Sequence, residues 1–125
     1  MLGNAPVVAN VPVVDLHRAR LFYSEKLGLK ETMSQPGAAY FEAGQGTKIF
    51  LYERGEPTKA EHTAASFKVD DVLAAVNALK AKGVTFESYD MGEITTDANN
   101  IAHIGDIQAS WFKDTEGNIL CVGNE

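Results

Sequence analysis

The chain contains one short pattern twice, and the spacing between the two copies constrains the fold more than any other feature. Asp15 begins an apolar helical stripe that ends at Gly28. Asp70 or Asp71 begins a second stripe, which ends at Gly83. Asp70 lies 55 residues after Asp15, and the two glycines have the same separation. A chance alternation of helices and strands is the alternative, but the matched spacing favours a true repeat.

A repeat of this length in only two copies predicts paired halves rather than a stacked solenoid. Strand-like segments surround each stripe, at residues 7–14, 29–34, 38–43 and 47–53 in the first half and 63–69, 84–89, 107–113 and 118–122 in the second. Turn residues such as Pro36-Gly37 separate neighbouring segments. The pattern therefore predicts that each half consists of a strand, a helix and three further strands. We expect the two halves to pack together around one hydrophobic core.

Composition narrows the class of protein. A chain of 125 residues is expected to form one domain that buries about two-thirds of its unfolded surface. The net charge of −6 argues against nucleic acid and anionic membranes as partners, because both require a basic surface. The single cysteine excludes an internal disulfide. No apolar run approaches the roughly 20 residues of a membrane span, and the chain start lacks the basic residues of a signal peptide, so a cytoplasmic location is expected.

Two motifs at the ends of the chain resemble one family. The opening segment VPVVDLHRARLFYSEKLGLKE carries Asp15-Leu16, Phe22-Tyr23 and Leu27-Gly28, and the closing segment WFKDTEGNIL contains an Asp-x-x-Gly-Asn turn. Both are similar to motifs of the vicinal oxygen chelate superfamily, which includes glyoxalase I, extradiol dioxygenases, and fosfomycin and bleomycin resistance proteins. Thr115 replaces the usual proline of the closing turn, and Glu116 replaces the usual aspartate.

The resemblance covers nearly the whole chain and implies an α+β fold. Two βαβββ modules would form a half-open β-cup around a ligand, within a single domain at residues 1–125. Module one would span about 5–56 and module two about 60–125. A half-open sheet leaves strand edges that must be covered, so a homodimer is also expected.

Metal-dependent members of the superfamily hold a divalent ion in the cup with His and Glu side chains. The positions that match these ligands hold, in chain order, Val8, Phe50, Ala64 (or Thr63 in a register shifted by one) and Cys121. One soft thiolate does not make a metal site. The resemblance therefore implies no metal in the cup, and it disfavours metal-dependent glyoxalase, dioxygenase or thiol-transfer chemistry.

A cup without a metal still has an interior that can bind a ligand. Strand alternation places Asn10 with Val8 and Pro12, Tyr52 with Phe50, and Ser66 with Ala64 and Lys68. The resemblance adds Trp111, which lies three residues before Asp114 at a position that faces the ligand in fosfomycin-type relatives. The predicted ligand-binding residues are Asn10, Phe50, Tyr52, Ser66, Trp111, Cys121 and His103. The aromatic members could instead only fill a core. Cys121 is interpreted as a packing residue, because reactive thiols require a nearby positive charge or helix N-terminus.

The segment at residues 88–106 is long and poor in strand pattern, so we expect it to flank the cup mouth with Met91 or His103 able to reach inward. The expected function is that of a metal-independent, glyoxalase-like or bleomycin-resistance-like protein that binds a small organic molecule and needs no cofactor. One alternative is a lyase, isomerase or transferase of the superfamily that uses residues such as Tyr52, His62 or His103. A second alternative is a dimeric interaction module with a vestigial cup.

Overall fold

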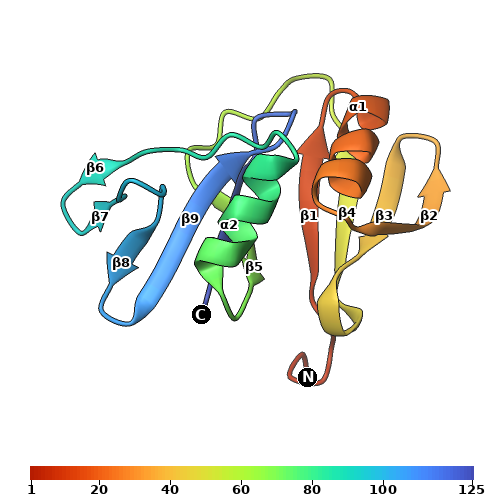
Figure 1. The fold of residues 1–125 in the computed structure, drawn as a ribbon. Coiled ribbons are helices and arrows are strands. Elements are labelled where there is room, and N and C mark those ends of the chain that lie inside the picture. The colour runs from red at the N-terminus through yellow and green to blue at the C-terminus, as the bar shows by residue number, and fades with distance from the viewer. The chain divides into compact units, whose positions relative to one another are not determined.

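The computed structural model describes residues 1–125, and the chain divides into two compact units (Figure 1). Unit 1 comprises Met1–Lys59 together with Thr115–Gly117. Unit 2 comprises Ala60–Asp114 and Asn118–Glu125. Three residues of the closing turn therefore belong to the first unit, although they lie near the end of the chain.

The elements of unit 1 are β1 (Val8–Val13), α1 (Leu16–Leu21), a π-helical turn η1 (Phe22–Lys26), β2 (Lys30–Gln35), β3 (Ala38–Glu42), a 3₁₀ turn η2 (Gly44–Gly46) and β4 (Lys48–Glu53). The elements of unit 2 are β5 (Thr63–Lys68), α2 (Val72–Ala81), β6 (Asp90–Met91), β7 (Ile94–Thr95), β8 (Ala102–Ile104), β9 (Ile107–Lys113) and β10 (Ile119–Gly123). Neither helix has the length and apolar character needed to cross a bilayer.

The two units share one sheet topology. The strand order is β1-β4-β3-β2 in unit 1 and β5-β10-β9-β8 in unit 2. In both sheets the first strand runs parallel to the last, and the other pairs are antiparallel. Helix α1 contacts β3 and β4, and α2 contacts β9 and β10, so each helix covers one face of its own sheet (Figure 1). The predicted α+β class and the two βαβββ modules are confirmed.

The helix boundaries follow the predicted signals, with one shift. The Asp15 carboxylate accepts a hydrogen bond from the Arg18 amide at 3.0 Å, and the Asp71 carboxylate accepts one from the Ala74 amide at 3.0 Å. The second cap is therefore Asp71 rather than Asp70, one residue later than the repeat spacing indicated. Gly28 (φ +73°) has the left-handed backbone that a residue with a Cβ rarely adopts just after a helix.

The strand predicted at residues 84–89 was wrong in its extent. Only Phe86 bridges to Phe112, and the Glu87 amide donates to the Trp111 carbonyl at 2.8 Å. The chain then leaves the sheet, forms the β6–β7 pair, and returns as β8 on the same side of β9. The edge strand of the second module is thus interrupted by an insertion. Segment 88–106, predicted to be poor in strands, contains three short ones, β6, β7 and β8.

The core of each unit lies between its sheet and its helix. In unit 1 the strand residues on this side are Val11, Val13, Ala39, Phe41, Ile49 and Leu51, all buried. Tyr23 of η1 is fully buried and lies 6.0 Å from Phe41 between ring centroids. In unit 2 the corresponding residues are Phe112, Leu120 and Val122 on the strands and Val72 and Val76 on α2. The opposite face of each sheet has no helix of its unit against it.

A buried carboxylate fixes the start of α1. The Glu116 side chain is 1% exposed and accepts hydrogen bonds from the amides of Val14 and Asp15, both at 2.9 Å. It also binds the Arg18 guanidinium through Nε at 2.8 Å and Nη2 at 3.1 Å, and the Thr115 hydroxyl at 2.8 Å. Burial alone would raise the pKa of Glu116, but the bonds from Arg18, Asp15, Thr115 and Val14 outweigh it and lower the pKa to about 2.

We expect Glu116→Gln to lower the free energy of unfolding by about 2 kcal/mol at pH 7, because a neutral amide leaves the Arg18 charge and one backbone donor poorly paired. A lowered folded-state pKa stabilises the folded state above the ordinary value of 4.5, and this contribution is lost as the pH falls toward about 2. The difference in unfolding free energy between wild type and variant should therefore shrink as the pH falls across that interval. Urea denaturation at several pH values measures this difference.

Glu25→Gln is the matched control, because Glu25 is exposed on η1. It should leave the unfolding free energy nearly unchanged at pH 7. A difference between wild type and Glu116→Gln that is absent at pH 7, or that is independent of pH between 5 and 2, would contradict the assigned role of Glu116.

Candidate functional site

The face of the unit 1 sheet opposite α1 carries a row of aromatic side chains. Strand register aligns Asn10, Phe50 and Tyr40 across β1, β4 and β3, and it aligns Pro12 with Tyr52. The rings of Tyr40 and Phe50 lie 4.6 Å apart, and those of Phe50 and Tyr52 stack at 6.1 Å with an interplanar angle of 16°. We call these five residues the aromatic face.

Strand alternation explains why these rings are only half-buried. Ile49 and Leu51 of β4 point to the helix side and are buried, so the intervening Phe50 and the following Tyr52 point the other way. Asn10 is exposed, and its side-chain amide donates only to the nearby Val8 carbonyl at 3.1 Å. The structure therefore brings together Asn10, Phe50 and Tyr52, three of the predicted ligand-binding residues, on one accessible surface.

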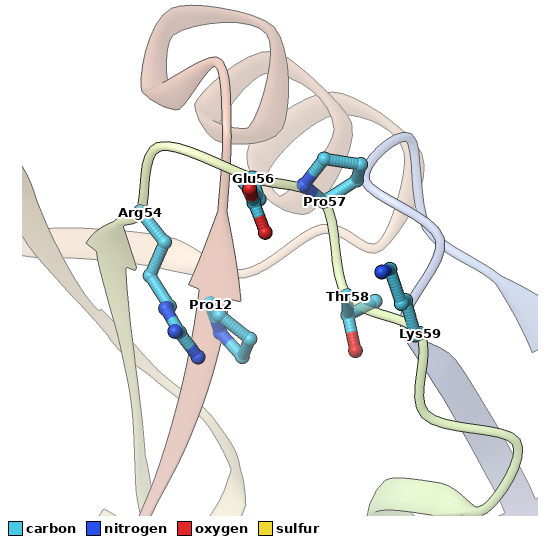
Figure 2. Close-up of a pocket in the computed structure, with 6 residues that line it drawn as sticks. All are labelled: Pro12, Arg54, Glu56, Pro57, Thr58 and Lys59. Atoms are coloured by element: carbon cyan, nitrogen blue, oxygen red, sulfur yellow. The ribbon is translucent and has the colours of Figure 1, made fainter.

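A pocket of about 230 Å³ lies at the end of this face (Figure 2). It is lined by Pro12, Arg54, Glu56, Pro57, Thr58 and Lys59. Most of the lining comes from the segment that follows β4, and the Arg54 side chain runs alongside Pro12 (Figure 2). The sequence-based prediction missed this pocket. Its signal was present, because Arg54 follows Phe50 and Tyr52 at the two-residue spacing of one strand face.

A second group forms on the helix-free face of the unit 2 sheet. Cys121 of β10 lies between Ser66 of β5 and Trp111 of β9 in the strand register. The Trp111 indole donates to the Thr63 hydroxyl at 3.2 Å, and its ring meets that of Tyr89 edge-on at 5.5 Å. The predicted residues Ser66, Trp111 and Cys121 are thus cross-strand neighbours, and they form the cysteine row.

The register of β5 differs from the one first predicted. A bulge between Ile119 and Leu120 pairs Ile119 with Thr63 and Leu120 with Ala65, so Ala64 falls out of register. Thr63 takes the place beside the cysteine row that the unshifted register assigned to Ala64. The shifted register, which had been the alternative, describes this strand.

Cys121 has the surroundings of a packing residue. It is 7% exposed, and burial raises the pKa of its thiol above the ordinary value. Hydrogen bonds with the Ser66 side chain and the Ser110 backbone oppose this effect without cancelling it. A thiol in such a site stays protonated at neutral pH and is a poor nucleophile.

His103 does not join the cysteine row. It is exposed on β8 and pairs in register with Gln108, so alternation places it on the face opposite Trp111. Its Nε2 atom lies 2.8 Å from the Asp97 carboxylate, which also accepts from the amides of Asn99 and Ile101. The His103 hydrogen bond is the largest cause that lowers the pKa of Asp97.

The remaining candidates lie on the surface. His62 precedes β5 and is exposed, and Met91 in β6 is 61% exposed. Among the positions that match family metal ligands, Val8 and Phe50 share the helix-free face of the first sheet, and Cys121 lies on that of the second. Within each unit, no group of three or more His, Cys, Asp or Glu side chains is placed to hold a metal ion.

A family model shows the family of this chain, and solved structures show its fold. The family model described as the Glyoxalase/Bleomycin resistance protein/Dioxygenase superfamily matches residues 6–122. The chain is 29% identical to the uncharacterized protein YurT of Bacillus subtilis (strain 168) in an alignment 134 positions long, which covers 93% of this chain and 95% of YurT.

Two solved structures illustrate the shared fold. TnmS3, an antibiotic binding protein from Streptomyces sp. CB03234, has a TM-score of 0.68 and 22% identity, with 98% of this chain and 96% of TnmS3 covered. The fosfomycin resistance protein FosX from Listeria monocytogenes, complexed with Mn(II) and sulfate, has a TM-score of 0.67 and 15% identity, with 100% of this chain and 94% of FosX covered.

We expect the Cys121 thiol to react with iodoacetamide at least about tenfold more slowly in the folded protein than in urea at pH 8, because burial limits access and disfavours the thiolate. Mass spectrometry of the alkylated fraction over time measures both rates. The chain has one cysteine, so the signal has a single source. Equal rates in the two states would show that the folded protein does not shield Cys121, and a faster rate in the folded protein would show that its thiol is activated.

Proposed function

We propose that this chain, which belongs to the glyoxalase/bleomycin resistance protein/dioxygenase superfamily, binds a small organic molecule on its aromatic face and does so without a metal ion. The observation that supports this most directly is the row of Tyr40, Phe50 and Tyr52 on a helix-free sheet face, in which the central Phe50 ring contacts both of its neighbours and all three rings are partly exposed. The nearly parallel rings of Phe50 and Tyr52 offer an apolar surface on which a planar ligand can stack.

The physical basis for binding is the burial of apolar area against rigid rings. Stacked aromatic pairs contribute about 0.5–1.5 kcal/mol beyond the area they remove from water. The rings are fixed by their strands and by one another, so a ligand would pay little to order them. Asn10 beside Phe50 and the hydroxyls of Tyr40 and Tyr52 add polar groups that can orient a ligand.

The cysteine row is proposed as a second binding surface, which lies wholly within unit 2. It offers an indole ring at Trp111, a hydroxyl at Ser66 and a small neutral thiol at Cys121. The same fold serves antibiotic binding in the Streptomyces protein, and we extend a binding role of that kind to this chain.

The proposal of metal independence rests on residue chemistry. Val8 and Phe50 carry no lone pair or charge for a cation. Thr63 carries only a neutral hydroxyl, which already accepts a hydrogen bond from the Trp111 indole. The raised pKa of Cys121 disfavours the thiolate that a metal requires. The Listeria protein of the same fold is described with Mn(II), so a metal-binding relative provides the contrast. We propose that ligand recognition here depends on apolar contact and hydrogen bonds alone.

A thermal-shift screen over metabolites and antibiotics, run with and without EDTA, should identify ligands whose binding does not depend on the chelator. We expect Phe50→Ala to weaken binding of such a ligand about tenfold, because the central ring of the aromatic face is lost. Calorimetric titration measures the Kd, and the fluorescence of Trp111, the only tryptophan, reports contact with the cysteine row.

Phe67→Ala is the matched control, because Phe67 lies in unit 2 and pairs with the buried Val122 on the helix side of the β5–β10 pair. It should leave the Kd nearly unchanged. Binding abolished by EDTA would contradict metal independence. Turnover of a bound compound would favour the alternative of a lyase, isomerase or transferase. A screen in which no compound binds would favour the alternative of a dimeric interaction module.

We also propose that the chain forms a homodimer. The β5 edge carries the exposed residues Thr63, Ala64 and Ser66, and its only charged residue is Lys68 at the end. An exposed strand edge with so little charge is open to pairing with another chain, and a second copy of this chain would cover it.

Light scattering at micromolar concentration should report a mass near twice 13.5 kDa. Ala64→Lys should shift the mass toward the monomer, whereas Ala81→Lys on the exposed side of α2 should not. A wild-type monomer would refute the dimer.

A further inference from the structure

Arg54 extends the aromatic face by one position. The Arg54 amide donates to the Val13 carbonyl at 2.8 Å, so the backbone of Arg54 is held against β1 directly after the last residue of β4. Alternation along an extended chain then directs the Arg54 side chain to the same side as Phe50 and Tyr52. Arg54 lies about 7 Å beyond Tyr52 along the strand, which is the rise of two residues.

Pro12 joins the aromatic face to the pocket. It is the register partner of Tyr52 and one of the residues that line the pocket. In Figure 2 the Arg54 side chain lies beside Pro12, so the guanidinium borders the same surface as the rings. A ligand that stacks on Tyr52 can therefore extend into the pocket without leaving this sheet face.

The side chains that line the pocket carry a net charge of +1. Its lining contains Arg54 and Lys59 as cations and Glu56 as the single anion, and none of the three forms an ion pair. The other arginines of the chain are both paired, Arg18 with Glu116 and Arg20 with Glu31. Arg54 is thus the one guanidinium without a carboxylate, in a chain whose net charge is −6.

We infer that the ligand of the aromatic face is a planar aromatic carboxylate whose ring stacks on Phe50 and Tyr52 and whose carboxylate is bound by Arg54. This inference rests on the proposed binding function and specifies the chemical class of the ligand. A guanidinium binds a carboxylate with two parallel hydrogen bonds, and its planar shape matches a carboxylate held in the plane of a ring. Lys59 adds positive charge at the far side of the pocket, and Glu56 opposes it.

The test uses 2-naphthoate and its neutral analogue 2-naphthamide as probes, titrated against the full chain by ligand-observed NMR. We expect wild type to bind naphthoate about tenfold or more tightly than naphthamide, because only the carboxylate gains the charge-assisted bonds. Arg54→Gln should remove that preference while leaving naphthamide binding unchanged. Glu56→Gln should strengthen naphthoate binding, because it removes the opposing carboxylate. The preference should also fall as salt is added.

Arg20→Gln is the matched control, because it makes the same chemical change on α1, which covers the other face of the sheet. It should leave both affinities unchanged. Equal affinity for the two probes, or equal effects of Arg54→Gln and Arg20→Gln, would overturn the inference. A failure of naphthoate to bind would overturn it as well. The proposed binding function would survive each of these results if a neutral ligand from the screen still lost affinity in Phe50→Ala.

Discussion

In each unit a single helix and a four-stranded sheet pack together, and the second face of the sheet has no helix of that unit to cover it. This asymmetry determines which strand side chains are buried against the helix and which lie on the face that no helix of the unit covers. Along β4, the side chains of Ile49 and Leu51 point to the helix and form part of the core. The side chains of Phe50 and Tyr52, which alternate with them, point to the opposite face. The same two-residue period that builds the core therefore also builds the aromatic face. A change of register by one residue would exchange the two sets.

Much of this arrangement could be predicted from the sequence because it depends on local signals. Asp15 and Gly28 bound the first helical segment through hydrogen bonding and backbone conformation, which act within one helical turn. Alternation along β4 is equally local, so the grouping of Phe50 with Tyr52 followed from the strand assignment. In the cysteine row, Ser66 was predicted from alternation along β5, whereas Cys121 and Trp111 were predicted from positions that match the family.

The errors lie where long-range contacts outweigh local pattern. The bulge beside Ile119 depends on how β5 and β10 pair, so the sequence of β5 alone could not reveal that Ala64 leaves the register. The interrupted edge strand after α2 has a nearer cause, because the Tyr89 amide bonds to the Thr96 hydroxyl seven residues later and so satisfies a backbone donor that a continuous strand would have paired. The role of Glu116 depends on amides about one hundred residues earlier in the chain. The strand was correctly expected to end at Glu53, and Arg54 was overlooked because alternation was not followed past that end.

The position of Glu116 has a consequence for synthesis of the chain on the ribosome. The first 59 residues contain every strand and helix of unit 1, but not the carboxylate that binds the amides of Val14 and Asp15. Those donors and the Arg18 guanidinium receive this partner only after almost the entire chain has been translated. Unit 1 therefore cannot reach its final stability as an early, independent intermediate during translation, although its sheet is encoded first. The two units share one topology, yet unit 1, which is translated first, depends on Glu116, which is translated almost last.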